Sequence, residues 1–167
     1  MRYAAAAIAL SLVVGVTASA GIGADRQPDP RAAALVAEGK SRLASGQVEA
    51  AIDSFEAALA VDPGYTTVYL ELGDAARAQG LQGKAIRYYR EALARDPRNL
   101  AALSGEGKAM LEKGAVDKAR RNLAQLQSLC GDSCGEAQQL AAAIQSHPRQ
   151  AVLTAEAVVP DPVVTQN

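Results

Sequence analysis

Apolar side chains recur along the middle of the chain at the three- and four-residue spacing of an amphipathic helix. Between Val48 and Ala60 this spacing puts Ala51, Phe55 and Ala58 on one face, and such a face packs against neighbouring helices. The pattern predicts paired helices at 31–45 and 48–60 and at 66–79 and 81–95, then helices at 100–113 and 136–146. Small apolar residues, mainly alanine, supply most of the 49% hydrophobic content. The fold is therefore predicted to be all-α.

The same pattern returns after 34 residues, since Ala51, Phe55 and Pro63 correspond to Ala85, Tyr89 and Pro97. Two sets of glycines keep this spacing: Gly39, Gly73 and Gly107, and then Gly46, Gly80 and Gly114. A fixed period of this size is typical of a solenoid, in which each unit buries its apolar face only against its neighbours. Three repeats are predicted, at 32–65, 66–99 and 100–130.

The repeated positions resemble the tetratricopeptide repeat (TPR) family, whose pattern runs W-x2-L-G-x2-Y, then A-x3-F, then Pro. The second repeat fills these positions with Tyr69, Leu72, Gly73, Ala85, Tyr89, Ala92 and Pro97, and the first with Leu35, Gly39, Ala51, Phe55, Ala58 and Pro63. The resemblance implies a TPR α-solenoid of about three helix pairs. It also implies that Gly39, Gly73 and Gly107 let the two helices of one repeat approach closely.

The third repeat departs from the pattern in its second half. Leu123 stands at the aromatic position and Gly131 at the proline position. A solenoid must cover the apolar face of its last unit, so the helix at 136–146 is predicted to be a C-terminal cap. The proline- and valine-containing segment 147–167 has no helical period and is predicted to be a disordered tail.

The N-terminus has the order of a secretory signal peptide. Arg2 precedes an apolar run from Tyr3 to Ala18, and Ala18-Ser19-Ala20 offers a small-residue cleavage site. The favoured interpretation is a signal peptide at 1–20 cleaved after Ala20, a linker at 21–30, and a periplasmic or secreted mature protein. The alternative is an uncleaved membrane anchor, because the apolar run reaches about the length of a spanning helix. A membrane contact is expected only in that case.

Cys130 and Cys134 flank a Gly-Asp-Ser turn. In an oxidising compartment such a pair is expected to close into a structural disulfide. A redox-active pair is an alternative, although its usual spacing is C-x-x-C at a helix N-terminus. Two thiolates are too few for a metal site.

Little in the sequence indicates catalysis. His147, the one histidine, has no nucleophile beside it, and no glycine-rich phosphate loop is followed by Lys and Ser or Thr. No enzyme activity, cofactor, metal or small-molecule substrate is expected. The 17 basic and 18 acidic residues form no cationic cluster along the sequence, so nucleic-acid binding is not expected either.

TPR proteins generally hold a peptide or helix in a concave groove lined by the first helix of each repeat. The resemblance implies that nine residues of this chain line the partner groove: Val36, Lys40, Leu43, Leu70, Asp74, Arg77, Ser104, Lys108 and Leu111. Lys40, Arg77 and Lys108 are candidates to bind a carboxylate. TPR domains that clamp chaperone C-termini have Asn at positions filled here by Lys40 and Asp74, which argues against a cytosolic co-chaperone.

The resulting hypothesis is an exported TPR adaptor or scaffold that binds a peptide or helix of an envelope protein, with pilus or envelope-complex assembly as the process considered. Among exported TPR proteins, the Flp/Tad pilus-assembly group is the resemblance considered first. The alternative is a structural, self-associating module whose tail, including Ala151 to Val159, occupies a groove. The sequence names neither the partner nor the pathway.

Overall fold

The computed structural model describes residues 27–147, which form seven α-helices and no strand. The signal peptide predicted at 1–20 and the tail beyond His147 lie outside these residues. The helices are α1 (Pro30–Ala44), α2 (Val48–Val61), α3 (Thr67–Ala78), α4 (Gln82–Arg95), α5 (Leu100–Glu112), α6 (Val116–Cys130) and α7 (Gly135–Ser146). Each boundary predicted from the sequence lies within one residue of the observed one. Among residues 27–147, no helix has the length and apolar content to cross a membrane.

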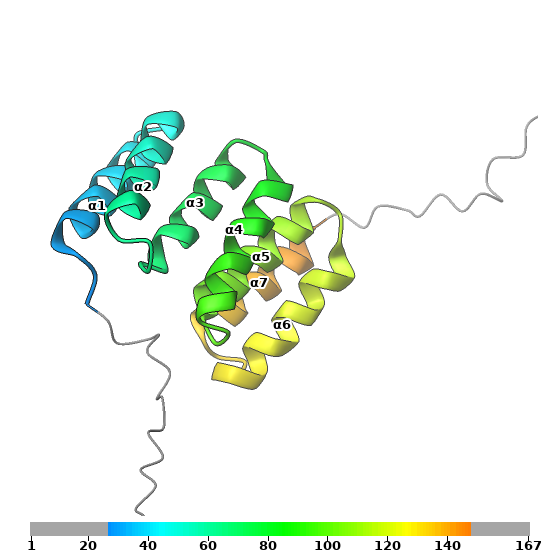
Figure 1. The fold of residues 1–167 in the computed structure, drawn as a ribbon. Helices are drawn as coiled ribbons and strands as arrows, with labels where there is room; N and C mark the ends of the chain where they lie inside the picture. The colour runs from blue at the N-terminus through cyan, green and yellow to red at the C-terminus, as the bar shows by residue number, and fades with distance from the viewer. Residues whose placement is uncertain (1–26, 148–167) are drawn as a thin grey trace, which may run out of the picture.

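Three helix pairs stack in sequence order, and α7 packs against α5 and α6 (Figure 1). The first helices of the pairs contact one another, α1 with α3, α3 with α5, and α5 with α7. The backbones of the second helices do not, since α2 makes no close contact with α4, nor α4 with α6. The predicted all-α solenoid is confirmed, and α7 covers the end of the stack as the predicted cap.

Local signals in the sequence account for where the helices begin and end. The Asp29 side chain caps α1 by accepting a 2.8 Å hydrogen bond from Arg31 N, and Pro30 occupies the first helical position. Gly46, Gly80 and Gly114 end α1, α3 and α5 with φ of 75°, 73° and 82°, which glycine adopts without a steric penalty. The buried Asp62 joins the two ends of the first repeat, because its carboxylate accepts from Asp29 N before α1 and from Gly64 N after α2, each at 3.1 Å.

The glycines within the first helices make room for large side chains. A Cβ on Gly39 would lie 2.4 Å from the Phe55 ring, and one on Gly73 would lie 2.6 Å from the Tyr89 ring. These two contacts confirm the predicted close approach within a repeat. Gly107 differs, because its nearest neighbour is Leu140 of α7, at 2.6 Å from the same hypothetical atom. The same hypothetical atom would lie 3.4 Å from Asn122 Cβ on α6, so Gly107 makes room for the capping helix as well as for the second helix of its own repeat.

The third repeat forms a full second helix despite its departures from the pattern. Leu126, which is fully buried, takes the position held by Ala58 and Ala92 in the earlier repeats. Leu123, at the aromatic position, is half-buried and packs with Leu126 and Leu140 in the apolar cluster under α7. Larger aliphatic side chains thus replace the aromatic ring where the solenoid ends.

Candidate functional site

The predicted partner groove follows the first helices of the repeats, α1, α3 and α5, and α7 continues this row in the structure. Its three cations lie on successive helices, Lys40 on α1, Arg77 on α3 and Lys108 on α5. Each cation reaches a polar side chain on the next of these helices. A ladder of polar contacts therefore links the helices of this face.

The first contact joins α1 to α3. Lys40 Nζ lies 2.9 Å from Glu71 Oε1, and 58% of the Lys40 side chain is exposed against 12% for Glu71. The hydrogen bond to Glu71 and the negative charge of the Glu71 carboxylate raise the pKa of Lys40 above the ordinary lysine value. An incoming carboxylate at Lys40 would have to compete with this resident acid.

Arg77 is more enclosed and has two acidic neighbours. Its Nε lies 3.2 Å from both carboxylate oxygens of Glu112, its Nη2 also bonds Glu112, and its Nη1 lies 3.6 Å from Asp74 Oδ1. Burial alone would lower the pKa of Arg77, but the Glu112 hydrogen bond, with the neighbouring Tyr89, raises it above the ordinary arginine value. The Arg77 charge is therefore balanced within the protein.

Lys108 is the exception in the ladder. Its Nζ donates a 2.9 Å hydrogen bond to the amide oxygen of Gln139 on α7. Because this acceptor is neutral, the Lys108 charge has no carboxylate partner among the described residues. Lys108 is consequently the groove cation best placed to receive an acidic group.

The other predicted groove residues divide by burial. Val36, Ser104 and Leu111 are each 4% exposed, so their side chains belong to the core. Ser104 Oγ bonds Glu136 O of α7 at 3.4 Å, which shows that α7 covers this position. Leu43 and Leu70 are half-buried and keep an accessible apolar edge. Val36, Ser104 and Leu111 therefore offer a partner little accessible side-chain surface in this structure.

Asp74 faces solvent but is tied to the core. Its Oδ1 accepts a 2.6 Å hydrogen bond from the hydroxyl of Tyr89, a residue only 1% exposed. Burial, followed by the Asp74 charge, raises the pKa of Tyr89. The phenol therefore remains a donor, and Asp74 is held between Tyr89 and Arg77.

Reading positions from the family pattern missed Glu71, Glu112 and Gln139. These three side chains lie 31, 35 and 31 residues after their cationic partners. Glu71 and Glu112 could have been identified from the sequence, because each acid follows a cation by about one repeat length and lies on the next first helix. The neutral Gln139 carried no such signal.

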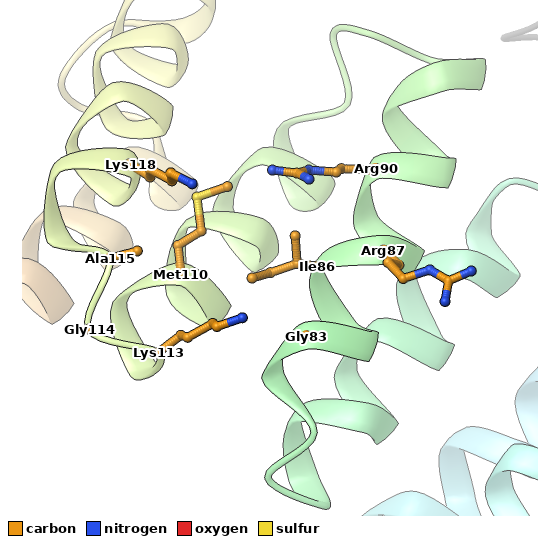
Figure 2. Close-up of a pocket in the computed structure, with 9 residues that line it drawn as sticks. All are labelled: Gly83, Ile86, Arg87, Arg90, Met110, Lys113, Gly114, Ala115 and Lys118. Atoms are coloured by element: carbon orange, nitrogen blue, oxygen red, sulfur yellow. The ribbon is translucent and has the colours of Figure 1, made fainter.

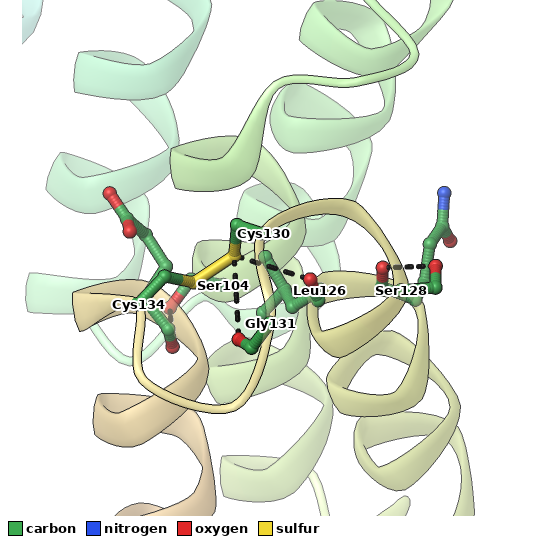
Figure 3. The surroundings of a disulfide bond; sticks show 8 residues. Ser104, Leu126, Ser128, Cys130, Gly131 and Cys134 are labelled. Atoms are coloured by element: carbon green, nitrogen blue, oxygen red, sulfur yellow. Dashed lines mark hydrogen bonds between the residues drawn. A yellow bond between two sulfur atoms is a disulfide. The ribbon is translucent and has the colours of Figure 1, made fainter.

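Cys130 and Cys134 form the predicted disulfide between the end of α6 and the start of α7 (Figure 3). Cys130 Sγ lies 3.2 Å from the carbonyl oxygen of Leu126, and Ser104 of α5 lies next to the bridge. The bond is placed to hold the turn that sets α7 on the stack. Among residues 27–147, no group of three or more His, Cys, Asp or Glu side chains could hold a metal ion.

Solved structures with the same fold include the first TPR of Spaghetti (RPAP3) bound to the HSP90 peptide SRMEEVD, at 18% identity and a TM-score of 0.64, covering 71% of this chain and 97% of that one. The Sgt2 TPR domain from Aspergillus fumigatus matches at 21% identity and a TM-score of 0.63, covering 84% and 92%. The Yersinia enterocolitica secretion chaperone SycD with a peptide of the translocator YopD matches at 23% identity and a TM-score of 0.60, covering 69% and 87%.

No curated protein sequence matches the chain significantly. The tetratricopeptide repeat profile matches residues 36–97 and 70–127, which together span more than half of the chain. The helix pairs and their glycine and aromatic positions agree with this match. The chain belongs to the tetratricopeptide repeat family.

Proposed function

We propose that this protein is a non-enzymatic adaptor that binds a peptide or helix of a partner protein on the face formed by α1, α3, α5 and α7. The observation that carries the proposal is Lys108, a half-buried cation whose only described partner, Gln139, is neutral. TPR structures with bound HSP90 and YopD peptides support this use of the fold. The partner would place an acidic group at Lys108.

Charge balance along the ladder indicates how the partner would lie. Glu71 and Glu112 already satisfy Lys40 and Arg77, so these two cations hold neighbouring first helices together. The half-buried Leu43 and Leu70 would contact apolar side chains of the partner. Burial of apolar surface beside one favourable ion pair suits a moderate, reversible complex.

Site-specific photo-crosslinking would test this assignment. A photoreactive amino acid would replace Lys40 or Leu70 on the proposed face, so that the Lys108 charge is kept, or the exposed Glu56 on α2 as the matched control. The expected result is one protein crosslinked from Lys40 and Leu70 and absent from Glu56. Equal crosslinking from all three positions, or capture from Glu56 alone, would show that the partner binds elsewhere.

The finer proposal is that the adaptor is exported and serves an envelope protein in pilus or envelope-complex assembly. It rests on the signal-like order of residues 1–20. Intact mass measurement of protein from the envelope fraction should give a chain beginning at Gly21. A chain that retains residues 1–20 and is recovered with the cytosol would contradict export, and the identity of the crosslinked partner would test the pilus assignment.

A further inference from the structure

A second group of cations surrounds a cleft away from the Lys40–Lys108 ladder. The cleft has a volume of about 400 Å³ and lies between α4 and the turn that joins α5 to α6. It exists because the backbones of α4 and α6 do not come into close contact. Arg87, Arg90, Lys113 and Lys118 line it, with Ile86 and Met110 between them (Figure 2).

The centre of the cleft is apolar. Met110 is 5% exposed and belongs to a cluster with Leu111 and Ala119, against which Ile86 packs. Figure 2 shows the Met110 and Ile86 side chains facing each other across the cleft. An apolar side chain of a ligand would find contact there, and the flexible Met110 side chain can adjust to its shape.

Arg90 is held in position to bind an anion. Its Nε donates a 2.7 Å hydrogen bond to Oε1 of Glu106, a residue 6% exposed. Oε2 of Glu106 accepts at 2.9 Å from Asn122, so the carboxylate is fixed by α4 and α6 together. The Arg90 Nη atoms bond no described residue and stay available. A guanidinium fixed at Nε can present both Nη atoms to one carboxylate.

The remaining cations leave the cleft positively charged. Arg87, Lys113 and Lys118 have no carboxylate partner among residues 27–147. By contrast, Arg95 on α4 is paired with Glu91, and Arg120 on α6 is paired with Asp117. Lys118 lies in the first turn of α6, where the helix dipole disfavours a cation. Figure 2 shows Lys113 and Lys118 directed toward Ile86 and Met110, while Arg87 points away and contributes only its field.

From these contacts we infer that the cleft is a second docking site, which binds an acidic peptide segment of a partner protein. One carboxylate pairs with Arg90, others with Lys113 and Lys118, and an apolar side chain between them rests on Ile86 and Met110. The inference goes beyond the proposed adaptor function, because it gives the chain a second binding surface on its second helices. One molecule could then hold two partners.

The test uses the full chain and a fluorescein-labelled acidic peptide, EELEE, titrated by fluorescence polarisation at low salt. The cleft variant is Lys113→Glu with Lys118→Glu, and its charge-matched control is Arg31→Glu with Arg98→Glu, two exposed residues outside the cleft. We expect the cleft variant to bind about tenfold more weakly and the control to change Kd less than about twofold. A peptide with serine in place of leucine, EESEE, should also bind more weakly than EELEE.

Three results would overturn the inference. Equal losses in the cleft and control variants would mean unspecific attraction. Loss of EELEE binding on Lys108→Ala, with the cleft variant unaffected, would place the peptide on the first-helix face. If phosphatidylglycerol vesicles, but not EELEE, distinguish the cleft variant from the control, the cleft faces an anionic membrane surface instead. Circular dichroism of each variant verifies that the helices are retained.

Discussion

The hydroxyl of Tyr89 donates a 2.6 Å hydrogen bond to Asp74 Oδ1. Tyr89 is only 1% exposed, whereas the Asp74 carboxylate lies at the protein surface. Phe55, at the equivalent position of the preceding repeat, lacks the hydroxyl. The bond therefore distinguishes the second repeat. It connects the core of the α3–α4 pair to the proposed partner face.

Replacing Tyr89 by phenylalanine removes this bond and keeps the ring. We expect the free energy of unfolding to fall by about 1 kcal/mol, the net contribution of one hydrogen bond. The loss stays this small because water can solvate the exposed Asp74 once the phenol is gone. Urea denaturation would measure the change. Tyr65→Phe is the control, as the structure shows no hydrogen bond from the Tyr65 hydroxyl, and equal losses in both variants would contradict this role for Asp74.

Gly107→Ala should move or loosen the capping helix. The added methyl group would lie 2.6 Å from Leu140, and overpacking of this kind typically costs about 1–3 kcal/mol. Gly83→Ala is the matched substitution, because a Cβ there meets nothing within 4 Å; it should stabilise α4 by about 0.5–1 kcal/mol. The urea midpoint of unfolding should fall for Gly107→Ala and rise for Gly83→Ala.

A double-mutant cycle tests whether Leu140 is the cause. In a Leu140→Ala background the space beside Gly107 is open, so Gly107→Ala should cost less than it does in the native background. An unchanged cost would mean that the methyl group disturbs α5 in another way.

The Lys40–Glu71 pair predicts a pH dependence at the alkaline end. The pKa of Lys40 is raised in the folded state above its ordinary value of 10.5, so the folded protein holds this proton more tightly than the unfolded chain. The stabilisation is fully present below pH 10.5 and is lost as the pH rises through the folded-state pKa. The difference in melting temperature between the native protein and Lys40→Met should therefore shrink above pH 10.5.

Lys84→Met supplies the comparison for Lys40. Lys84 lies over the Tyr88 ring, 5.7 Å from its centroid, and has no carboxylate partner among the described residues. The alkaline change in the melting-temperature difference should be larger for Lys40→Met than for Lys84→Met, because only Lys40 has a carboxylate partner. An identical trend for both lysines would indicate a general loss of positive charge.

The disulfide is predicted to be structural. Replacing Cys130 and Cys134 by serine opens a short loop, for which the chain-entropy model gives about 2 kcal/mol. The double variant should lose about that much stability, measured by thermal unfolding, and should retain partner crosslinking from Lys40. Loss of crosslinking by a variant that is still folded would favour the redox alternative.

The sequence by itself determined the repeat, the helices and their ends. The 34-residue spacing, the turn glycines such as Gly46 and the Asp29-Pro30 start act through neighbouring backbone groups, so they can be recognised without knowing the fold. The Cys130–Cys134 pair is equally local. Gly39 and Gly73 were also interpreted correctly, because their partners Phe55 and Tyr89 belong to the same repeat.

Only the tertiary structure decided which of the predicted groove side chains are accessible and which are paired or covered. Lys40 and Arg77 are neutralised by acids on the next helix, and Ser104 is covered by α7, although all three occupy groove positions in the family pattern. The approach of Arg90 to Lys113 and Lys118 likewise depends on how α4 stacks against the next pair. The physical reason is that the rotation between successive repeats sets these contacts, and that rotation results from packing over the whole interface.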